Sequence, residues 1–129
     1  MRFAFLLALT MLAACDSPKP QSPADTWERS LQCSAQADHL AQQYGWDKII
    51  AGWKSHYNAQ RQRCFVLKID GGSGEELYDA AGKISLGSAK GTGSFLRECE
   101  SNFDHPFTED PKTVDCGEFR ALLQDLLEK

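Results

Sequence analysis

The residues of this sequence best suited to chemistry are its cysteines and histidines. Metal sites and redox centres need such residues close together, as in a CxxC pair, and the sequence contains no CxxC pair. The histidines are also far apart and lack the spacing of metal ligands. We therefore expect no metal site and no cofactor. The residues concerned are Cys15, Cys33, Cys64, Cys99 and Cys116, together with His39, His56 and His105.

The first cysteine ends a short apolar segment at the N-terminus. Arg2 supplies a positive charge, and the uncharged run over residues 3–14 is shorter than the roughly 20 residues needed to cross a membrane. It has the length of the apolar part of a secretory signal. The segment Leu12–Cys15, with the letters LAAC, resembles the lipobox of bacterial lipoproteins. In that family a diacylglycerol is attached to the cysteine sulfur, and cleavage makes the cysteine the N-terminus.

The lipobox resemblance implies a signal peptide over residues 1–14 and a protein held by its lipid on the periplasmic side of a cell membrane. The alternative is an ordinary signal peptide with an incidental cysteine. Residues 15–24 are the lipidated Cys15 and a polar, proline-rich tether, which leaves one globular domain over residues 25–129. Asp16 resembles the signal that retains enterobacterial lipoproteins in the inner membrane. The resemblance therefore favours the inner membrane, with the outer membrane as the alternative.

The other four cysteines are expected to form two disulfides. An even number of cysteines in an exported protein indicates disulfide bonds, because the compartment is oxidising. Three pairings are possible. We favour Cys33–Cys64 and Cys99–Cys116, because each pair would join neighbouring elements.

Helical periodicity marks both ends of the mature chain. The first helix is expected to begin at Asp25 or Thr26 and to end at Gly45, with Trp27 and Tyr44 as core anchors. Leu31 falls on the same helical period.

The second helix is expected after Asp115, a residue suited to the N-cap, with Asp110–Pro111 as an alternative start. Its apolar stripe would pack on a sheet rather than bind a partner, because a small domain needs every apolar face for its core. The stripe consists of Phe119, Leu122, Leu123, Leu126 and Leu127.

The segment between the helices predicts an antiparallel meander of three or four strands, and thus an α+β fold. The clearest strand is Cys64–Ile69, in which alternate apolar residues predict one buried face and one exposed face. Further strands are expected over residues 49–57, 76–79 and 84–88. The glycine-rich residues 87–93 are expected to form a mobile loop, and residues 94–101 a short helix.

Three stretches of the domain resemble a pattern in small exported bacterial proteins of unknown function. The resemblance implies no activity. It favours a hairpin followed by a further strand, in which Tyr57 and Tyr78 would be cross-strand neighbours. The stretches are Ser55–Asn58, Arg63–Val66 and Leu77–Ala80.

The net charge and the motifs of the sequence limit the classes of function that the protein can have. The chain has a net charge of −4, which argues against nucleic-acid binding because that depends on a basic patch. We expect a non-enzymatic binding or accessory module that is anchored to the membrane and has a protein partner in the cell envelope. One alternative is an inhibitor or exclusion-type lipoprotein that blocks an incoming enzyme or transfer machinery. The other is a small hydrolase using His56, although Ser55 would point to the opposite face of a regular strand.

Overall fold

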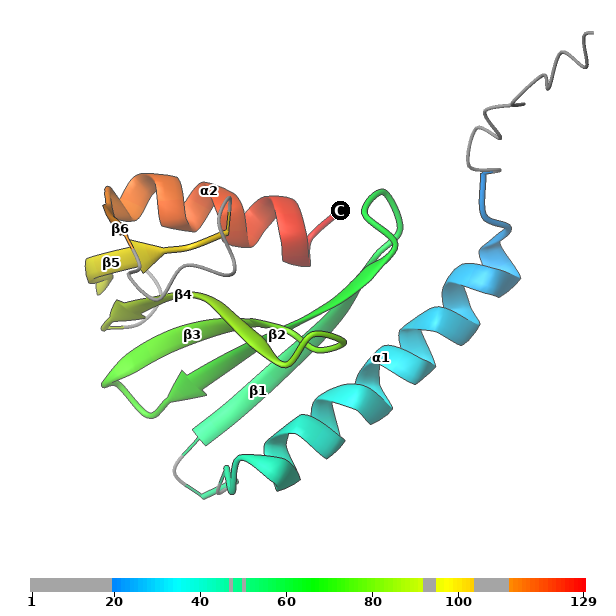
Figure 1. Ribbon diagram of the computed structural model, residues 1–129, viewed down its shortest axis with the longest axis horizontal. Helices are drawn as coiled ribbons and strands as arrows, with labels where there is room; N and C mark the ends of the chain where they lie inside the picture. Colours follow the sequence, from blue (N-terminus) through cyan, green and yellow to red (C-terminus); the bar gives the residue numbers. More distant parts are fainter. Residues whose placement is uncertain (1–19, 47, 50, 92–94, 104–111) are drawn as a thin grey trace, which may run out of the picture.

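The computed structural model describes residues 20–46, 48–49, 51–91, 95–103 and 112–129. Within these residues, six antiparallel strands form one sheet in the order of the sequence, and a helix covers each of its two faces (Figure 1). The α+β class is confirmed, but the sheet has six strands instead of three or four. The elements are α1 (Pro23–Gln43), β1 (Ala51–Asn58), β2 (Arg63–Asp70), β3 (Gly74–Asp79), β4 (Ile84–Lys90), β5 (Arg97–Ser101), β6 (Lys112–Val114) and α2 (Cys116–Leu127).

The first helix begins earlier than its sequence pattern predicts. Ser22 is the N-cap, and its hydroxyl accepts a hydrogen bond from the backbone N–H of Asp25. The Asp25 carboxylate accepts one in return from the backbone N–H of Ser22 at 3.2 Å, which completes a capping box. Hydrogen bonds from Ser22 also hold the pKa of Asp25 below its usual range. Pro23 then occupies the first helical position, where a missing N–H costs nothing.

The prediction that Trp27 and Tyr44 anchor the core is wrong. Trp27 is 67% exposed and Tyr44 is 47% exposed, and Leu31 is exposed as well. The side of α1 that faces the sheet instead consists mainly of small side chains, which allow a close approach between the helix and the strands. The buried residues of α1 are Cys33, Ala37, Leu40 and Ala41.

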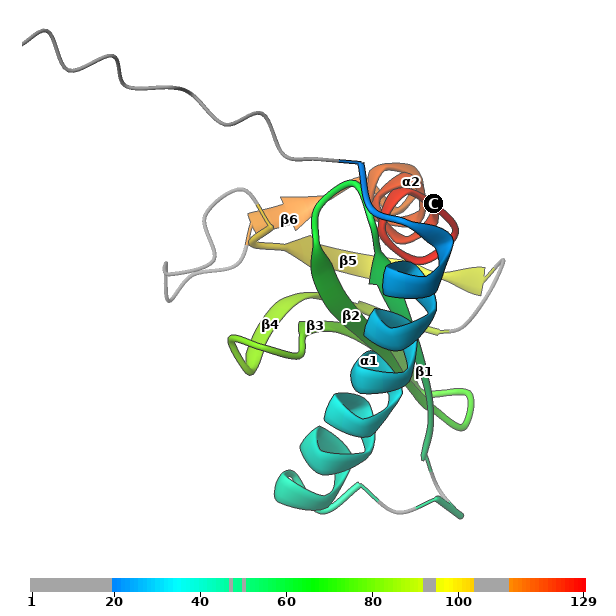
Figure 2. The same ribbon diagram turned by 90° about the vertical axis from the view of Figure 1, so that its right-hand side faces the viewer.

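Both faces of the central sheet are buried, which corrects the expectation of one exposed face. Phe65, Leu67 and Ile69 of β2 pack with α2, as their alternation predicts. Cys64 and Val66 point to the opposite face and pack with α1. Figure 2 looks onto α1, which lies in front of β1 and β2 and contacts both. The central strands therefore lie between two helices.

Two segments of the sheet differ from the sequence-based expectation. Residues 97–101, expected to be helical, form β5, and Lys112–Val114 forms β6 beside it. The strand Lys112–Val114 excludes a helix start at Asp110–Pro111. Residues 87–90 of the expected mobile loop belong to β4, and residues 92–93 lie outside the described residues. A Cβ atom at Gly87 would lie 2.6 Å from the Glu100 carbonyl oxygen, so β5 approaches the backbone closely at this position.

The structure contains two disulfides, in the arrangement that the sequence favours. Cys33–Cys64 ties α1 to β2, and Cys99–Cys116 ties β5 to the first residue of α2. Each helix is therefore bonded covalently to the sheet.

The C-terminal helix follows the prediction closely. Asp115 is its N-cap, and its carboxylate accepts a hydrogen bond from the backbone N–H of Gly117 at 2.7 Å. Phe119, Leu123 and Leu126 are buried against the sheet. The helix contacts β1, β4 and β5, so the last element of the chain spans a large part of the sheet.

Candidate ligand-binding pocket

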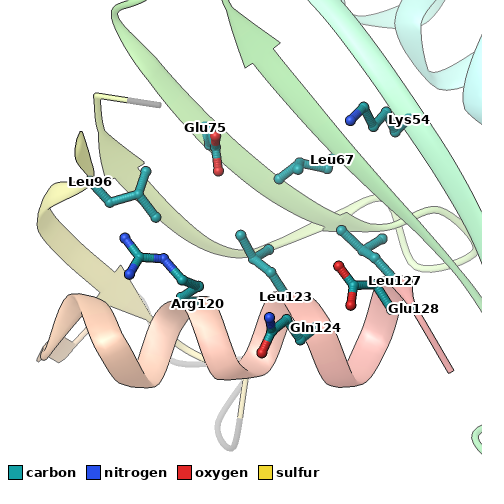
Figure 3. A pocket seen from close by; sticks show the side chains of 9 residues that line it. All are labelled: Lys54, Leu67, Glu75, Leu96, Arg120, Leu123, Gln124, Leu127 and Glu128. Atoms are coloured by element: carbon teal, nitrogen blue, oxygen red, sulfur yellow. The ribbon is translucent and has the colours of Figure 1, made fainter. Parts of the chain in front are cut away.

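A pocket of about 580 Å³ opens between α2 and the sheet (Figure 3). We call it the α2 pocket. Leu67 of β2 and Leu123 of α2 lie at its centre and form an apolar surface. Charged side chains surround this surface at both ends. In Figure 3, Glu75, Leu96 and Arg120 lie toward one end, and Lys54, Leu127 and Glu128 toward the other, with Gln124 on the outer side of the helix.

Strand register and helical spacing bring these residues together. Lys54 of β1 lies opposite Leu67 of β2, so both point to the α2 face of the sheet. On α2, Leu123 and Leu127 are one helical turn apart and therefore share a face. The pocket thus depends on regular secondary structure at its walls, which fixes the positions of the side chains.

The end of α2 beside the pocket is held by a buried asparagine on β1. The Asn58 side chain, only 1% exposed, donates a hydrogen bond to the Asp125 carbonyl oxygen at 2.9 Å. Its own side-chain oxygen accepts one from the backbone N–H of Arg61, also at 2.9 Å. The Arg61 guanidinium forms a salt bridge with the Asp125 carboxylate, which Lys129 also contacts. These bonds position the last turn of α2, which carries the pocket residue Leu127.

Glu75 is the most informative residue of the pocket, because it is a carboxylate in a buried position. It lies on β3 and is 8% exposed, on the same side of the sheet as Leu77. Burying a carboxylate costs several kcal/mol unless cations or hydrogen-bond donors compensate for the lost water. Arg120 and Lys54 supply positive charge to the same pocket. Alternate residues of a strand point to the same face, and Glu75 lies two residues from the apolar Leu77 on β3. This spacing is the sequence signal for a carboxylate that points to the buried face.

His56, the candidate for a hydrolase, does not line the α2 pocket. It lies on β1, where its Nε2 atom is enclosed and has no hydrogen-bond partner among the described residues. Ser55 points to the opposite face, as expected, and its hydroxyl lies 3.4 Å from that of Ser34 on α1. The structure therefore does not bring His56 and Ser55 together as a base and a nucleophile.

An aromatic cluster closes the other face of the sheet at the end of α1. The rings of Tyr44, Trp46 and Tyr78 contact one another, and Trp46 also contacts Trp53, with ring centroids 5.2–6.2 Å apart. Burial raises the pKa of Tyr78, and the Tyr44 hydroxyl donates a hydrogen bond to a backbone carbonyl. Tyr57 belongs to the same face but is not a cross-strand neighbour of Tyr78, because β2 lies between their strands. These contacts hold the C-terminal end of α1 on the sheet.

The lipidation and sorting residues Cys15 and Asp16 lie outside the described residues. Across the part of the chain that the structure describes, no three His, Cys, Asp or Glu side chains converge to hold a metal ion. No helix in that part is long and apolar enough to cross a membrane.

Comparisons with protein-family models, with curated proteins and with solved structures found no match to this chain.

Proposed function

We propose that this chain is a lipid-anchored binding module of the bacterial cell envelope and that the α2 pocket takes its ligand. The observation that carries the proposal is the pocket itself, with a leucine surface at its centre and charges of both signs around it. Its volume of about 580 Å³ lies within the range of about 300–1,000 Å³ that is typical of ligand sites. The anchor would concentrate the module at the membrane, where modest affinity for a ligand suffices.

The lining favours an amphipathic ligand. Leu67 and Leu123 would contact an apolar body, while Arg120 at one end and Lys54 at the other would attract acidic groups. Glu75 and Glu128 offer acceptors for donors on the ligand. A small molecule with an apolar body and a charged end has this chemistry, and so does a partner's peptide segment with alternating apolar and charged side chains.

The two other functions expected from sequence gain no support from the described residues. A hydrolase would need His56 within hydrogen-bond reach of its substrate, and that histidine lies outside the lining of the α2 pocket. An inhibitor would act through an exposed surface, and nothing in the described residues identifies an incoming enzyme or transfer machinery as the partner of such a surface.

The ligand proposal predicts saturable binding of anilinonaphthalene sulfonate, an anionic probe with an apolar body. We expect Leu127→Ala to weaken binding of the probe, because it removes part of the pocket wall. Leu122→Ala is the matched control, since Leu122 is a half-buried leucine of the same helix that lines a different hollow. Fluorescence titration of the folded proteins measures both affinities.

A second variant keeps this experiment independent of stability. Lys54→Trp changes an exposed side chain that lies on the α2 face of the sheet and fills one end of the pocket, so it is expected to abolish probe binding without unfolding the protein. Equal binding by the wild type, Leu127→Ala and Lys54→Trp would contradict the proposed site.

The anchor predicts the behaviour of Cys15→Ser in cells. This variant is expected to lose incorporation of labelled palmitate and to leave the membrane fraction, because no sulfur remains to carry the diacylglycerol. Ser17→Ala, two residues further on, is the control and should retain both properties. A Cys15→Ser protein that still takes up palmitate or stays with the membrane would refute lipidation at this cysteine. Separation of the two membranes on a density gradient tests the inner-membrane location proposed from Asp16.

A further inference from the structure

The side of α1 that faces away from the sheet carries an apolar stripe. Trp27 and Leu31 are 67% and 54% exposed, although both are large apolar residues. Two exposed alanines extend the stripe by one helical turn in each direction. The positions follow one another at intervals of three or four residues, so they share one helix face. We call Ala24, Trp27, Leu31 and Ala35 the outer stripe.

The outer stripe does not face the sheet. The residues that α1 buries there, among them Cys33, Ala37 and Leu40, lie on the other side of the helix. The helix packs on β1 and β2 through that other side (Figure 2). Trp27 and Leu31 therefore expose most of their apolar surface side by side on one helix face, which marks that face as a candidate contact surface.

We propose that the outer stripe lies in the interfacial region of the membrane that anchors Cys15. This inference rests on the proposed lipid anchor and adds an orientation to it. The described chain begins at Pro20, three residues before the start of α1, and Cys15 lies eight residues before Pro23. A chain extends by at most about 3.6 Å per residue, so the start of α1 lies within about 30 Å of the anchored sulfur. Tryptophan is enriched at this depth of a membrane because its ring is amphipathic.

A second copy of the chain is a weaker candidate for the same face. Specific protein interfaces bury more than about 1,000 Å² in total. The outer stripe offers only Trp27 and Leu31 as large side chains, with alanines on either side. A membrane surface needs no such area, because the lipid at Cys15 already holds the protein there.

Charge restricts how the stripe acts. Asp25 and Glu28 flank it, and the chain as a whole is acidic, with a net charge of −4. Helices that bind membranes independently are typically rich in lysine and arginine, which attract anionic lipids. The outer stripe therefore orients a domain that the lipid holds, and does not recruit the domain by itself.

The orientation has a consequence for the α2 pocket. Because α1 and α2 cover opposite faces of the sheet, a membrane beneath α1 places α2 on the far side of the domain. The pocket would then open toward the periplasm, where a ligand or partner can reach it.

Tryptophan fluorescence in vesicles tests the orientation. The full-length protein, purified from membranes, is placed in phosphatidylethanolamine–phosphatidylglycerol vesicles whose acyl chains carry bromine, a contact quencher. We expect quenching in the wild type and its loss in Trp27→Phe, since Trp46 and Trp53 lie in the aromatic cluster. Leu31→Glu should also reduce the quenching. Gln32→Glu adds the same charge to the neighbouring exposed position and should leave the quenching unchanged.

Mass spectrometry of the same sample separates the ways in which the inference can fail. If the lipid mass is present and Trp27 is not quenched, the anchor stands and the orientation is wrong. If the lipid mass is absent, the anchor fails and the orientation fails with it. A Leu31→Cys variant that forms disulfide-linked dimers on the vesicles would assign the stripe to a second copy and overturn the proposal.

Discussion

Replacement of both Cys33 and Cys64 by alanine is expected to lower the free energy of unfolding by about 3–4 kcal/mol. The disulfide closes a loop with a sequence separation of 31 residues, and the chain-entropy estimate for that length gives this value. The loss of stability should be greatest at α1, because this helix buries little apolar area against the sheet. Ala37 and Ala41 are small, and Leu40 is the one large side chain that α1 buries. Thermal unfolding followed by circular dichroism should show the midpoint falling by about 15–25 °C.

The second disulfide provides the matched control. Replacement of Cys99 and Cys116 by alanine removes a bond with a sequence separation of 17 residues, and the same estimate gives about 3 kcal/mol. Hydrogen exchange of the α1 amides should increase strongly only when Cys33–Cys64 is absent. Equal protection of α1 in both variants would show that the helix does not depend on its disulfide. In the wild type, alkylation without reductant should label none of these four cysteines.

Phe119→Ala is expected to destabilise the protein by about 3–5 kcal/mol, the range for removing a buried aromatic ring. Phe119 is completely buried and belongs to the core between α2 and the sheet. Its ring lies 2.9 Å from the position that a Cβ atom would take at Gly87, so the ring packs directly on the backbone of β4. Urea unfolding measures the loss.

Two further variants identify the cause of that loss. Phe119→Leu keeps most of the apolar volume and should cost clearly less than Phe119→Ala. Gly87→Ala adds a methyl group where the ring and the Glu100 carbonyl oxygen already lie, and it should destabilise through overpacking. A cost below about 1 kcal/mol for Phe119→Ala would mean that α2 is not packed on β4 as described.

Patterns within short stretches of the sequence predicted those parts of the fold that such patterns largely determine. The spacing of Phe119, Leu123 and Leu126 predicts α2, and Asp115 marks its start. The disulfide pairing followed from the expectation that each pair joins neighbouring elements. In β2, the alternation of Phe65 and Leu67 predicts the face that packs on α2.

The wrong predictions concern segments whose structure depends on contacts with distant parts of the chain. Trp27 and Tyr44 are expected in the core because aromatic residues are commonly buried, but the sheet accepts the helix face that has small side chains, such as Ala37. The local pattern over residues 94–101 predicts a short helix, whereas Cys99 of β5 lies opposite Val114 in a strand pair that forms only in three dimensions.

The α2 pocket depends on the same non-local geometry. Its residues come from β1, β2 and β3, from the segment before β5 and from α2, and no short motif joins them. The sequence could have indicated one part of it, since Glu75 shares a strand face with the buried Leu77. It could not show which helix would cover that face.

The contact between α2 and β1 has a consequence for the order in which the protein matures. Under the proposed export, the chain would cross the inner membrane with its N-terminus first, so β1 would reach the periplasm well before the last helix. The face of β1 that carries Asn58 would remain uncovered until the carbonyl oxygens of Asp125 and Leu126 arrive. The domain could therefore complete its fold only after its C-terminal residues had crossed the membrane. Truncation at the C-terminus would stall maturation and leave the unfinished sheet accessible to envelope chaperones and proteases.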